Sequence, residues 1–355
     1  MRTRPHARRS VRATVLAAVA GTAVACGGAD TPDTGSPDAG SPETPAADAS
    51  WLAGEELWLN PEGHGPAAVQ QALAEGRTAD AEALAPLADQ PTATWIATPD
   101  NPYPAVEEIS LAAAAEDELP VLVAYNVPGR DCGSYSAGGA AGVDAYLSWI
   151  GSFAAALGDR PAVVVLEPDA VPQALVGCEG VDPAARYQLL AQAVEILDRQ
   201  PETRVYVDAG NASWVDDLPA LADALRRSGV DRADGFALNV SNYETTEASA
   251  DYGLELSREL EEAAPEGTPT VHFVVDTSRN GAGPPEDAPG GEGRWCNPPD
   301  REVGAPPTTS PDLDRVDALL WVKQPGDSDG TCAGGPPAGQ WWPEMALELV
   351  DGEDG

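Results

Sequence analysis

Short apolar stretches alternate along this chain with longer segments in which apolar residues recur every three or four positions. The short stretches are rich in Val, Ile and Leu and lack a helical period, so they predict strands. The longer segments, such as residues 143–157, have the period of helices. Because strand and helix alternate and no Gly-rich dinucleotide motif is present, we predict an α/β fold, a TIM-like parallel barrel in one domain. The seven predicted strands cover residues 92–97, 120–126, 162–166, 204–207, 235–240, 270–275 and 318–323.

The first 25 residues have the pattern of a secretory signal. Residues 2–12 contain five arginines and no acid, and the apolar stretch from Val11 to Ala25 is too short to span a bilayer as a permanent helix. We therefore predict a signal peptide over residues 1–25 and an exported protein. Two outcomes remain open at its end: lipidation of Cys26, giving a cell-surface lipoprotein, or simple cleavage after Ala25.

The next segment is too polar to fold by itself. From Gly27 to Ser50 the chain has no lysine, arginine or large apolar residue and consists of Pro, Gly, Asp, Glu, Ser, Thr and Ala. Such a composition cannot bury a core, so we predict a disordered acidic linker over residues 26–50. The folded domain is then expected over residues 51–355.

The net charge and the small number of histidines limit the partners and the kinds of catalytic site that this chain can have. The net charge of −38 disfavours nucleic acid and anionic membranes as partners, except through a lipid anchor at Cys26, although acidity also serves solubility or salt adaptation. Histidine occurs three times, at His6, His64 and His272, so His-based triads and His-rich metal sites are poorly supplied. We expect no metal or cofactor, and carboxylate chemistry on a neutral substrate.

Charged side chains and indoles stand at the ends of the predicted strands, where barrels bind ligands. Indoles stack on sugar rings while carboxylates and amides bind hydroxyls, so the pattern favours a polysaccharide. Two alternatives stay open: Arg130 and Asp131 either pin a loop or belong to a site, and each Trp is either core or sugar platform. Strand alternation places Trp321 on the face of Lys323, which favours the platform. The strand-end residues are Trp95, Arg130, Asp131, Asp169, Asp208, Trp214, Asn239, Asp276, Arg279, Trp321, Lys323, Asp327 and Asp329.

Hydrolysis of a glycosidic bond with inversion needs one protonated carboxylic acid and one carboxylate that activates water. Asp169 follows the most apolar strand, where burial and the nearby Asp131 raise its pKa, so we predict that it is the acid. The alternative is a helix cap. Asp329 lies near Lys323, which keeps it ionised but weakens it as a base.

Six ordered motifs, VAYNVPGRDCGSYSAGG, VVLEPDAV, VYVDAGNASW, ALNVSNY, VVDTSRNG and LLWVKQPGDSDGTC, resemble those of glycoside hydrolase family 6, inverting cellulases of β-1,4-glucan. The resemblance implies a distorted seven-stranded α/β barrel. It also implies Asp169 as proton donor, Asp131 as the acid that tunes it and Asp329 as the debated base. The resemblance also implies that Arg130, Arg279 and Lys323 are the cations around the base, and that Asp208 is a supporting carboxylate. The residues it places at the sugar are Trp95, Tyr125, Asp208, Asn211, Trp214, Asn239, Trp321, Lys323 and Asp327.

Three positions depart from the family pattern. Asn211 stands where His is usual, Asp327 where Glu is usual, and Ala137 where a Ser commonly helps to hold the catalytic water. The first two departures weaken sugar binding. The third puts the water path in doubt unless Ser136 or Tyr135 substitutes.

Four cysteines remain after Cys26, and four permit three pairings. Export makes disulfides expected. The family resemblance selects the pairs Cys132–Cys178 and Cys296–Cys332.

Loop lengths favour an open cleft and endo action, because only about ten residues follow Gly133 before the next helix. We also expect a monomer. Three alternatives remain: an exo-acting cellobiohydrolase, a carbohydrate-binding lipoprotein with little activity, and a hydrolase of a related β-glucan.

Overall fold

The computed structural model describes residues 50–262, 264, 268, 270–285 and 292–351. These belong to one compact unit, Asp48–Gly355. The predicted signal peptide, the lipidation site Cys26 and nearly all of the predicted linker lie outside the described residues.

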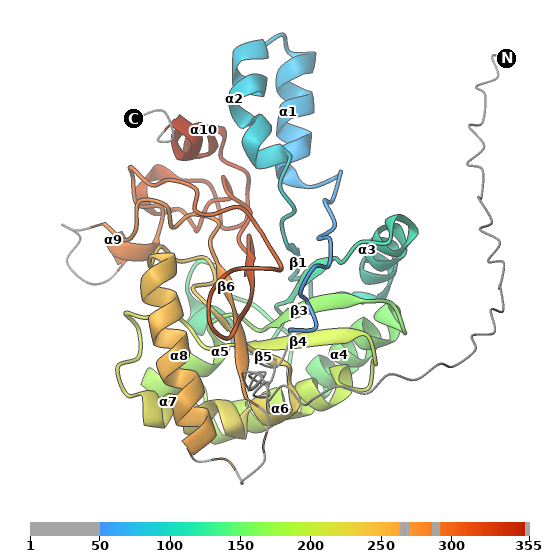
Figure 1. Cartoon of the computed structure of the whole chain (residues 1–355), viewed down its shortest axis with the longest axis vertical. Helices are drawn as coiled ribbons and strands as arrows, with labels where there is room; N and C mark the ends of the chain where they lie inside the picture. Colours follow the sequence, from blue (N-terminus) through green and yellow to red (C-terminus); the bar gives the residue numbers. More distant parts are fainter. Residues whose placement is uncertain (1–49, 263, 265–267, 269, 286–291, 352–355) are drawn as a thin grey trace, which may run out of the picture. The chain divides into compact units, whose positions relative to one another are not determined.

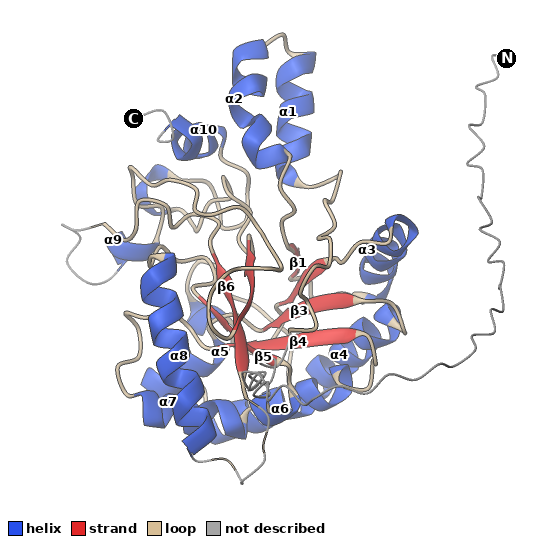
Figure 2. Ribbon diagram, viewed as in Figure 1, coloured by secondary structure: helices blue, strands red, loops and turns tan. Residues whose placement is uncertain are grey.

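A curled sheet of seven parallel strands forms the centre of this unit and confirms the predicted TIM-like fold (Figures 1 and 2). The strands pair in sequence order, so each helical connection returns the chain to the neighbouring position in the sheet. The strands are β1 (Thr94–Ile96), β2 (Val121–Ala124), β3 (Ala162–Leu166), β4 (Thr203–Asp208), β5 (Gly235–Leu238), β6 (His272–Asp276) and β7 (Val316–Leu320).

Helices surround the sheet and connect its strands (Figure 2). Two of them begin at a proline behind an aspartate cap: Asp182 accepts from the N–H of Ala185, and Asp217 from that of Ala220. The helices are α1 (His64–Ala74), α2 (Thr78–Ala88), α3 (Tyr103–Glu116), α4 (Val143–Leu157), α5 (Ala170–Val176), α6 (Pro183–Leu197), α7 (Leu218–Arg227), α8 (Thr246–Glu262), α9 (Glu292–Trp295) and α10 (Pro343–Asp351), with 3-10 turns η1 (Asp131–Gly133), η2 (Val230–Arg232) and η3 (Cys332–Gly334).

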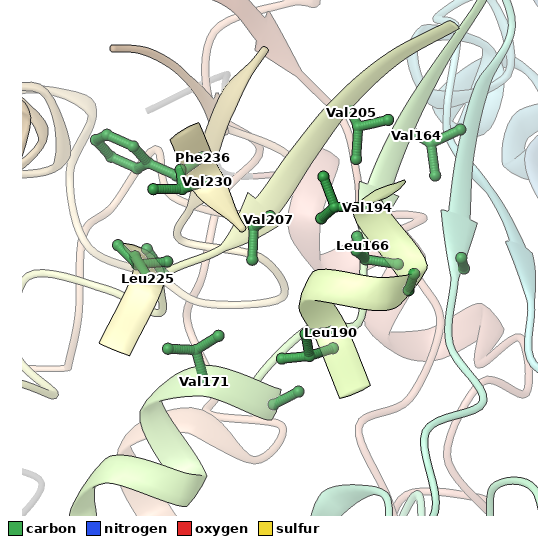
Figure 3. Packing of buried hydrophobic residues seen from close by; sticks show 14 of the residues in the cluster. Val164, Leu166, Val171, Leu190, Val194, Val205, Val207, Leu225, Val230 and Phe236 are labelled. Atoms are coloured by element: carbon green, nitrogen blue, oxygen red, sulfur yellow. The ribbon is translucent and has the colours of Figure 1, made fainter. Parts of the chain in front are cut away.

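Side-chain alternation along the strands creates two apolar layers. In β3, Val163 and Val165 pack inside the barrel, whereas Val164 and Leu166 pack outward among residues of the surrounding helices. Figure 3 shows the outer layer, with Leu190 and Val194 of α6 close to these strands. Strands β2, β3, β5 and β7 are buried at every position, which explains why they read as nearly continuous apolar runs.

The seam between the first and last strands corrects one prediction. A backbone hydrogen bond of 2.9 Å from Ala93 N–H to Trp321 C=O joins the two edges. Strand β7 ends at Leu320 rather than at residue 323, so alternation no longer fixes the direction of the next side chain. Trp321 is only 3% exposed and packs with α2 and α10, so the prediction that it is a sugar platform is wrong.

Both predicted disulfides are present. Cys132–Cys178 ties the loop after β2 to the end of α5, and Cys296–Cys332 ties the loop after β6 to the loop after β7. Within the described residues, no helix has the length and apolar character needed to cross a membrane.

Candidate active site

A cavity of about 1000 Å³ lies at the carboxyl ends of the strands. Ten of the predicted site residues line it: Trp95, Tyr125, Arg130, Asp131, Asp169, Asn211, Trp214, Lys323, Asp327 and Asp329. Four others, Asp208, Asn239, Arg279 and Trp321, are almost completely buried and lie outside the lining. A direct sugar contact predicted for Asp208 and Asn239 is therefore wrong, because both lie behind the wall.

Asp169 stands between the end of the buried strand β3 and the start of α5, and it lines the cavity. Its side chain makes no capping hydrogen bond to the helix, so the alternative of a side-chain helix cap is not the one seen. Burial raises the pKa of its carboxyl well above the ordinary value, and the negative charges of Asp208 and Asp131 raise it further. Lys323 opposes this shift only in part. The carboxyl of Asp169 is thus held in its protonated form at pH values where an exposed aspartate is ionised.

Asp208 supports Asp169 from behind. Its Oδ1 accepts hydrogen bonds from the N–H groups of Asp169, at 2.8 Å, and Gly210, at 3.1 Å. Burial raises the pKa of Asp208 to about 7 in spite of these two bonds. Asp208 therefore fixes the backbone of the acid and contributes to its raised pKa.

Asp131 lies in the loop after β2 and is only partly buried. Its Oδ2 accepts the N–H of Ser136 at 2.7 Å, and Gln173 Nε2 lies 3.4 Å from its Oδ1. Burial raises the pKa of Asp131 above its ordinary value, while these hydrogen bonds and Arg130 oppose the shift. Asp131 is consequently a more basic carboxylate than an exposed aspartate, and it faces the cavity.

Asp329 has the opposite surroundings. Its Oδ1 lies 2.9 Å from Arg279 Nη2 and 3.1 Å from Lys323 Nζ, and its Oδ2 accepts from Arg279 Nη1, Tyr243 Oη and Asn297 N–H. Burial alone raises its pKa, but Arg279 and Lys323 outweigh burial and lower the pKa to about 2. Asp329 therefore remains ionised throughout the physiological range, as predicted from its neighbours in sequence.

Arg130 pins the loop that carries Asp131. Its guanidinium donates to the main-chain oxygens of Ala97, Tyr125 and Ser136 at 2.6–2.9 Å and lies 4.5 Å from the centre of the Tyr125 ring. Of the two roles left open by the sequence, the loop pin is the one seen for Arg130. The predicted place of Arg130 among the cations around Asp329 is wrong, because the cations bound to that carboxylate are Arg279 and Lys323. Asp131 beside it is free to face the cavity.

Backbone strain gathers around the acid. Asp131, Cys132, Glu167 and Asp169 all have positive φ, between 48° and 70°, a region that residues other than glycine seldom adopt. Such strain persists only where surrounding structure enforces it, and it is typical of functional sites. Here Asp208 and the Cys132–Cys178 disulfide hold the strained segments in place.

The three departures from the family pattern all fall on the cavity wall. Asn211 Oδ1 accepts from Ser213 N–H at 3.1 Å and from Ser213 Oγ at 3.0 Å. Asp327 Oδ1 lies 2.6 Å from Nδ1 of His64. Ala137 lines the cavity together with Ser136 and Tyr135, whose hydroxyls remain the two predicted substitutes.

Several residues of the cavity wall were not predicted from the sequence. Tyr243 and Asn297 bind Asp329, Trp295 lines the cavity with 37% of its surface exposed, and His64 reaches the site from the start of α1. Their partners are 32 to 263 positions away in sequence, so spacing gave no sign of them. Only Trp295 could have been suspected from the local sequence, because it directly precedes Cys296 of a predicted disulfide.

In the described part of the chain, His, Cys, Asp and Glu side chains form no group of three able to hold a metal ion. A carboxyl with a raised pKa, Asp169, and one with a pKa of about 2, Asp329, in the same cavity match the requirement for acid-catalysed cleavage of a glycosidic bond.

Comparison with known proteins agrees with this geometry. Residues 52–353 match the family described as "Glycosyl hydrolases family 6". Endoglucanase 1 of Streptomyces halstedii is 43% identical over 78% of this chain and 83% of its own length. Endoglucanase A of Cellulomonas fimi is 41% identical over 76% of this chain and 56% of its own length.

A solved structure shows the same arrangement. The endoglucanase Cel6 from Mycobacterium tuberculosis, in complex with methyl-cellobiosyl-4-deoxy-4-thio-β-D-cellobioside, is 39% identical, with a TM-score of 0.78 over 86% of this chain and all of that one. The family match over residues 52–353 includes every strand end that lines the cavity. The chain therefore belongs to glycosyl hydrolases family 6 and is a glycoside hydrolase.

Proposed function

We propose that this protein is an endo-β-1,4-glucanase that hydrolyses cellulose or soluble β-1,4-glucan with inversion at the anomeric carbon. The observation that carries the proposal is the pair of opposed carboxyls, Asp169 with a raised pKa and Asp329 with a pKa of about 2, in one cavity. The endoglucanase relatives and the cello-oligosaccharide analogue bound by the mycobacterial structure support the choice of substrate.

In this mechanism Asp169 donates its proton to the glycosidic oxygen as the bond from that oxygen to the anomeric carbon breaks. The oxygen of a water molecule bonds to the anomeric carbon from the opposite face of the ring. Asp131 accepts the proton released by this water, directly or through a second water, because a carboxylate with a pKa of about 2 is a weak base. Asp329 contributes its fixed negative charge, which stabilises the positive charge that develops on the sugar ring.

The experiment that tests the assignment is hydrolysis of cellopentaose by the wild type and by Asp169→Ala. Turnover by the wild type and its loss in the variant are expected. If the wild type bound the oligosaccharide without cleaving it, the protein would instead be a carbohydrate-binding member of the family. A substrate panel that includes mixed-linkage glucan and xyloglucan decides between β-1,4-glucan and its relatives.

Inversion has a separate test. Proton NMR of the fresh products should show the α-anomer first, since the substrate is β-linked. A first-formed β-anomer would exclude the inverting mechanism while leaving the substrate assignment intact.

One observation favours the exo-acting alternative. The ring of Tyr135, in the loop after β2, lies 6.4 Å from that of Trp295, in the loop after β6, and a Cβ at Gly330 would collide with Tyr135. The two loops therefore meet beside the cavity. Endo action predicts a rapid fall in the viscosity of carboxymethylcellulose per bond cleaved, and exo action predicts a slow one.

We also propose that the enzyme acts outside the cytoplasm as a monomer. Two disulfides in a chain of this size are typical of oxidising compartments. Lipidation at Cys26 remains a prediction, and mass spectrometry of the protein expressed from its full gene tests it directly. A light-scattering mass tests the monomer.

A further inference from the structure

His64 connects the start of α1 to the cavity wall at two points. Its Nδ1 lies 2.6 Å from Asp327 Oδ1, and its main-chain N–H donates to Gln324 Oε1 at 3.2 Å. Residues about 260 positions apart in sequence are thereby joined beside the seam of β1 and β7. This double attachment fixes both the backbone and the ring of His64.

The ring also faces the cavity. His64, Asp327 and Gln324 all line it, and 44% of the His64 side chain is exposed, against 9% for Asp327. The edge of the Trp341 indole packs near the imidazole, with 6.4 Å between ring centres. Because Nδ1 is engaged by Asp327, Nε2 is the ring nitrogen left for a ligand.

The side chains of His64 and Asp327 lie in the part of the cavity beside the seam of β1 and β7. Asn60, Thr94 and Trp95 line the same region, and Asn60 Nδ2 donates to Thr94 Oγ1 at 3.2 Å. Trp214 and Asn211 follow β4, which is three strands from either edge of the curled sheet. A chain of sugars that extends across the cavity from Trp214 therefore reaches the seam, where His64 and Asp327 stand.

We propose that His64 and Asp327 form a sugar-binding pair, in which Asp327 orients the imidazole and His64 Nε2 hydrogen-bonds a hydroxyl of the glucan. The inference rests on the proposed function, since it names residues that hold that substrate. An imidazole accepts through Nε2 when neutral and donates when protonated, and a sugar hydroxyl satisfies either state. The pair also extends the reach of Asp327, whose side chain is one methylene shorter than glutamate.

Neighbouring groups act on the protonation of His64 in opposite directions. The hydrogen bond to Asp327 raises the pKa of His64 above its ordinary value, while burial and Lys323 oppose the increase. Glu62, on the segment before α1, is the other ionisable group of this region that lines the cavity. Asp327 can therefore hold the ring in one orientation on either side of neutrality.

His272 provides a matched control. Its Nδ1 lies 2.8 Å from Asp317 Oδ1, in the same type of pair, and neither residue lines the cavity. His272 begins β6, at the amino end of the strand, whereas the cavity is at the carboxyl ends. A change confined to His64 is therefore attributable to the cavity rather than to the loss of any His–Asp pair.

Two isosteric variants separate the two ring nitrogens. In His64→Asn the amide nitrogen takes the place of Nδ1 and retains the bond to Asp327, but nothing replaces Nε2. In His64→Gln the amide nitrogen takes the place of Nε2 and the bond to Asp327 is lost. We expect His64→Asn and His64→Ala to raise KM for cellopentaose by about tenfold, which is about 1.4 kcal/mol, with kcat within twofold of the wild type. Partial recovery of KM is expected in His64→Gln.

A direct readout comes from NMR of the imidazole groups in the full chain with Asp169→Ala, which allows saturation with intact cellopentaose. The sequence contains three histidines, so the resonances can be assigned by substitution. Saturation should shift the His64 signals and leave those of His272 unchanged. Reduced stability without a change in KM is the expected result for His272→Gln.

The possible failures are distinguishable. An inactive wild type would overturn the proposed function. An active wild type whose KM is the same in His64→Ala, or whose His64 signals do not move on saturation, would overturn the sugar-binding pair alone.

Discussion

Two carboxyls of the same cavity, Asp169 and Asp329, have the same side chain and opposite surroundings. Asp169 faces other carboxyls, Asp208 and Asp131, and its pKa is raised. Asp329 is bound by Arg279 and Lys323, and its pKa is lowered to about 2. Burial raises the pKa of both carboxyls, so burial cannot explain the difference between them. The difference comes from the cations within hydrogen-bonding distance, which, among the described residues, Asp329 has and Asp169 lacks.

The two environments also differ in what they cost the fold. The surroundings of a carboxyl that is held neutral add little to the stability of the fold. Removing one partner of a buried ion pair, in contrast, strongly destabilises the fold, because the other charge is left buried without a counter-ion. The first environment therefore serves the reaction, and the second serves the reaction and the fold together.

The largest effect is expected for removal of the acid. Asp169→Asn should lower kcat on cellopentaose about 10²- to 10⁴-fold, since the general acid contributes in that range. Steady-state kinetics measures this. Asp223→Asn is the matched control, because its side chain is 70% exposed on α7, and its kcat should equal that of the wild type.

The next largest effect is a difference in stability between the variants of the two carboxyls. Asp329→Asn leaves the buried Arg279 without its counter-ion, so we expect the free energy of unfolding at pH 7 to fall by about 3 to 5 kcal/mol. Asp169→Asn should be at least as stable as the wild type, since it removes a carboxyl whose ionisation is opposed by burial. Urea unfolding measures both, and equal losses in the two variants would contradict the comparison.

The raised pKa of the acid should depend on its neighbour. In Asp208→Asn a carbonyl oxygen can still accept the N–H of Asp169, but the negative charge that raises the acid's pKa is gone. The alkaline limb of the kcat/KM profile should therefore move to lower pH. Asp234→Asn is the control, because Asp234 also binds a backbone N–H of β4, outside the cavity, and should leave the limb in place.

The smallest effect concerns stability and pH. Burial raises the pKa of Glu167 from 4.5 to about 7 in the folded protein, so between these values the folded state holds a proton that the unfolded state has lost. The free energy of unfolding should therefore decrease as pH rises from 4.5 to 7. Glu167→Gln keeps an acceptor for the N–H groups of Asn126 and Val127. In this variant the decrease in the free energy of unfolding between pH 4.5 and 7 should be smaller by on the order of 2 kcal/mol. An unchanged slope would show that Glu167 is ionised throughout.

The sequence determined the fold class, the seven strands and most of the residues that meet at their carboxyl ends. Continuous apolar runs indicate strands buried on both faces, and parallel strands place their carboxyl ends at the same edge of the sheet. The motifs of the family added both disulfide pairs. Asp169, Asp131 and Asp329 could therefore be named before any contact between them was known.

Only the tertiary structure decided which of these residues face the cavity. Because β7 ends at Leu320, Trp321 turns into the core, while Trp295, at the end of the short helix α9, lines the cavity. Asp208, expected as a supporting carboxylate and a sugar contact, lies behind the wall and supports the acid alone, and His64 contacts Asp327 across 263 positions. Alternation predicts the direction of a side chain only within a strand, and contacts between distant loops depend on how the whole sheet curls, which local sequence does not encode.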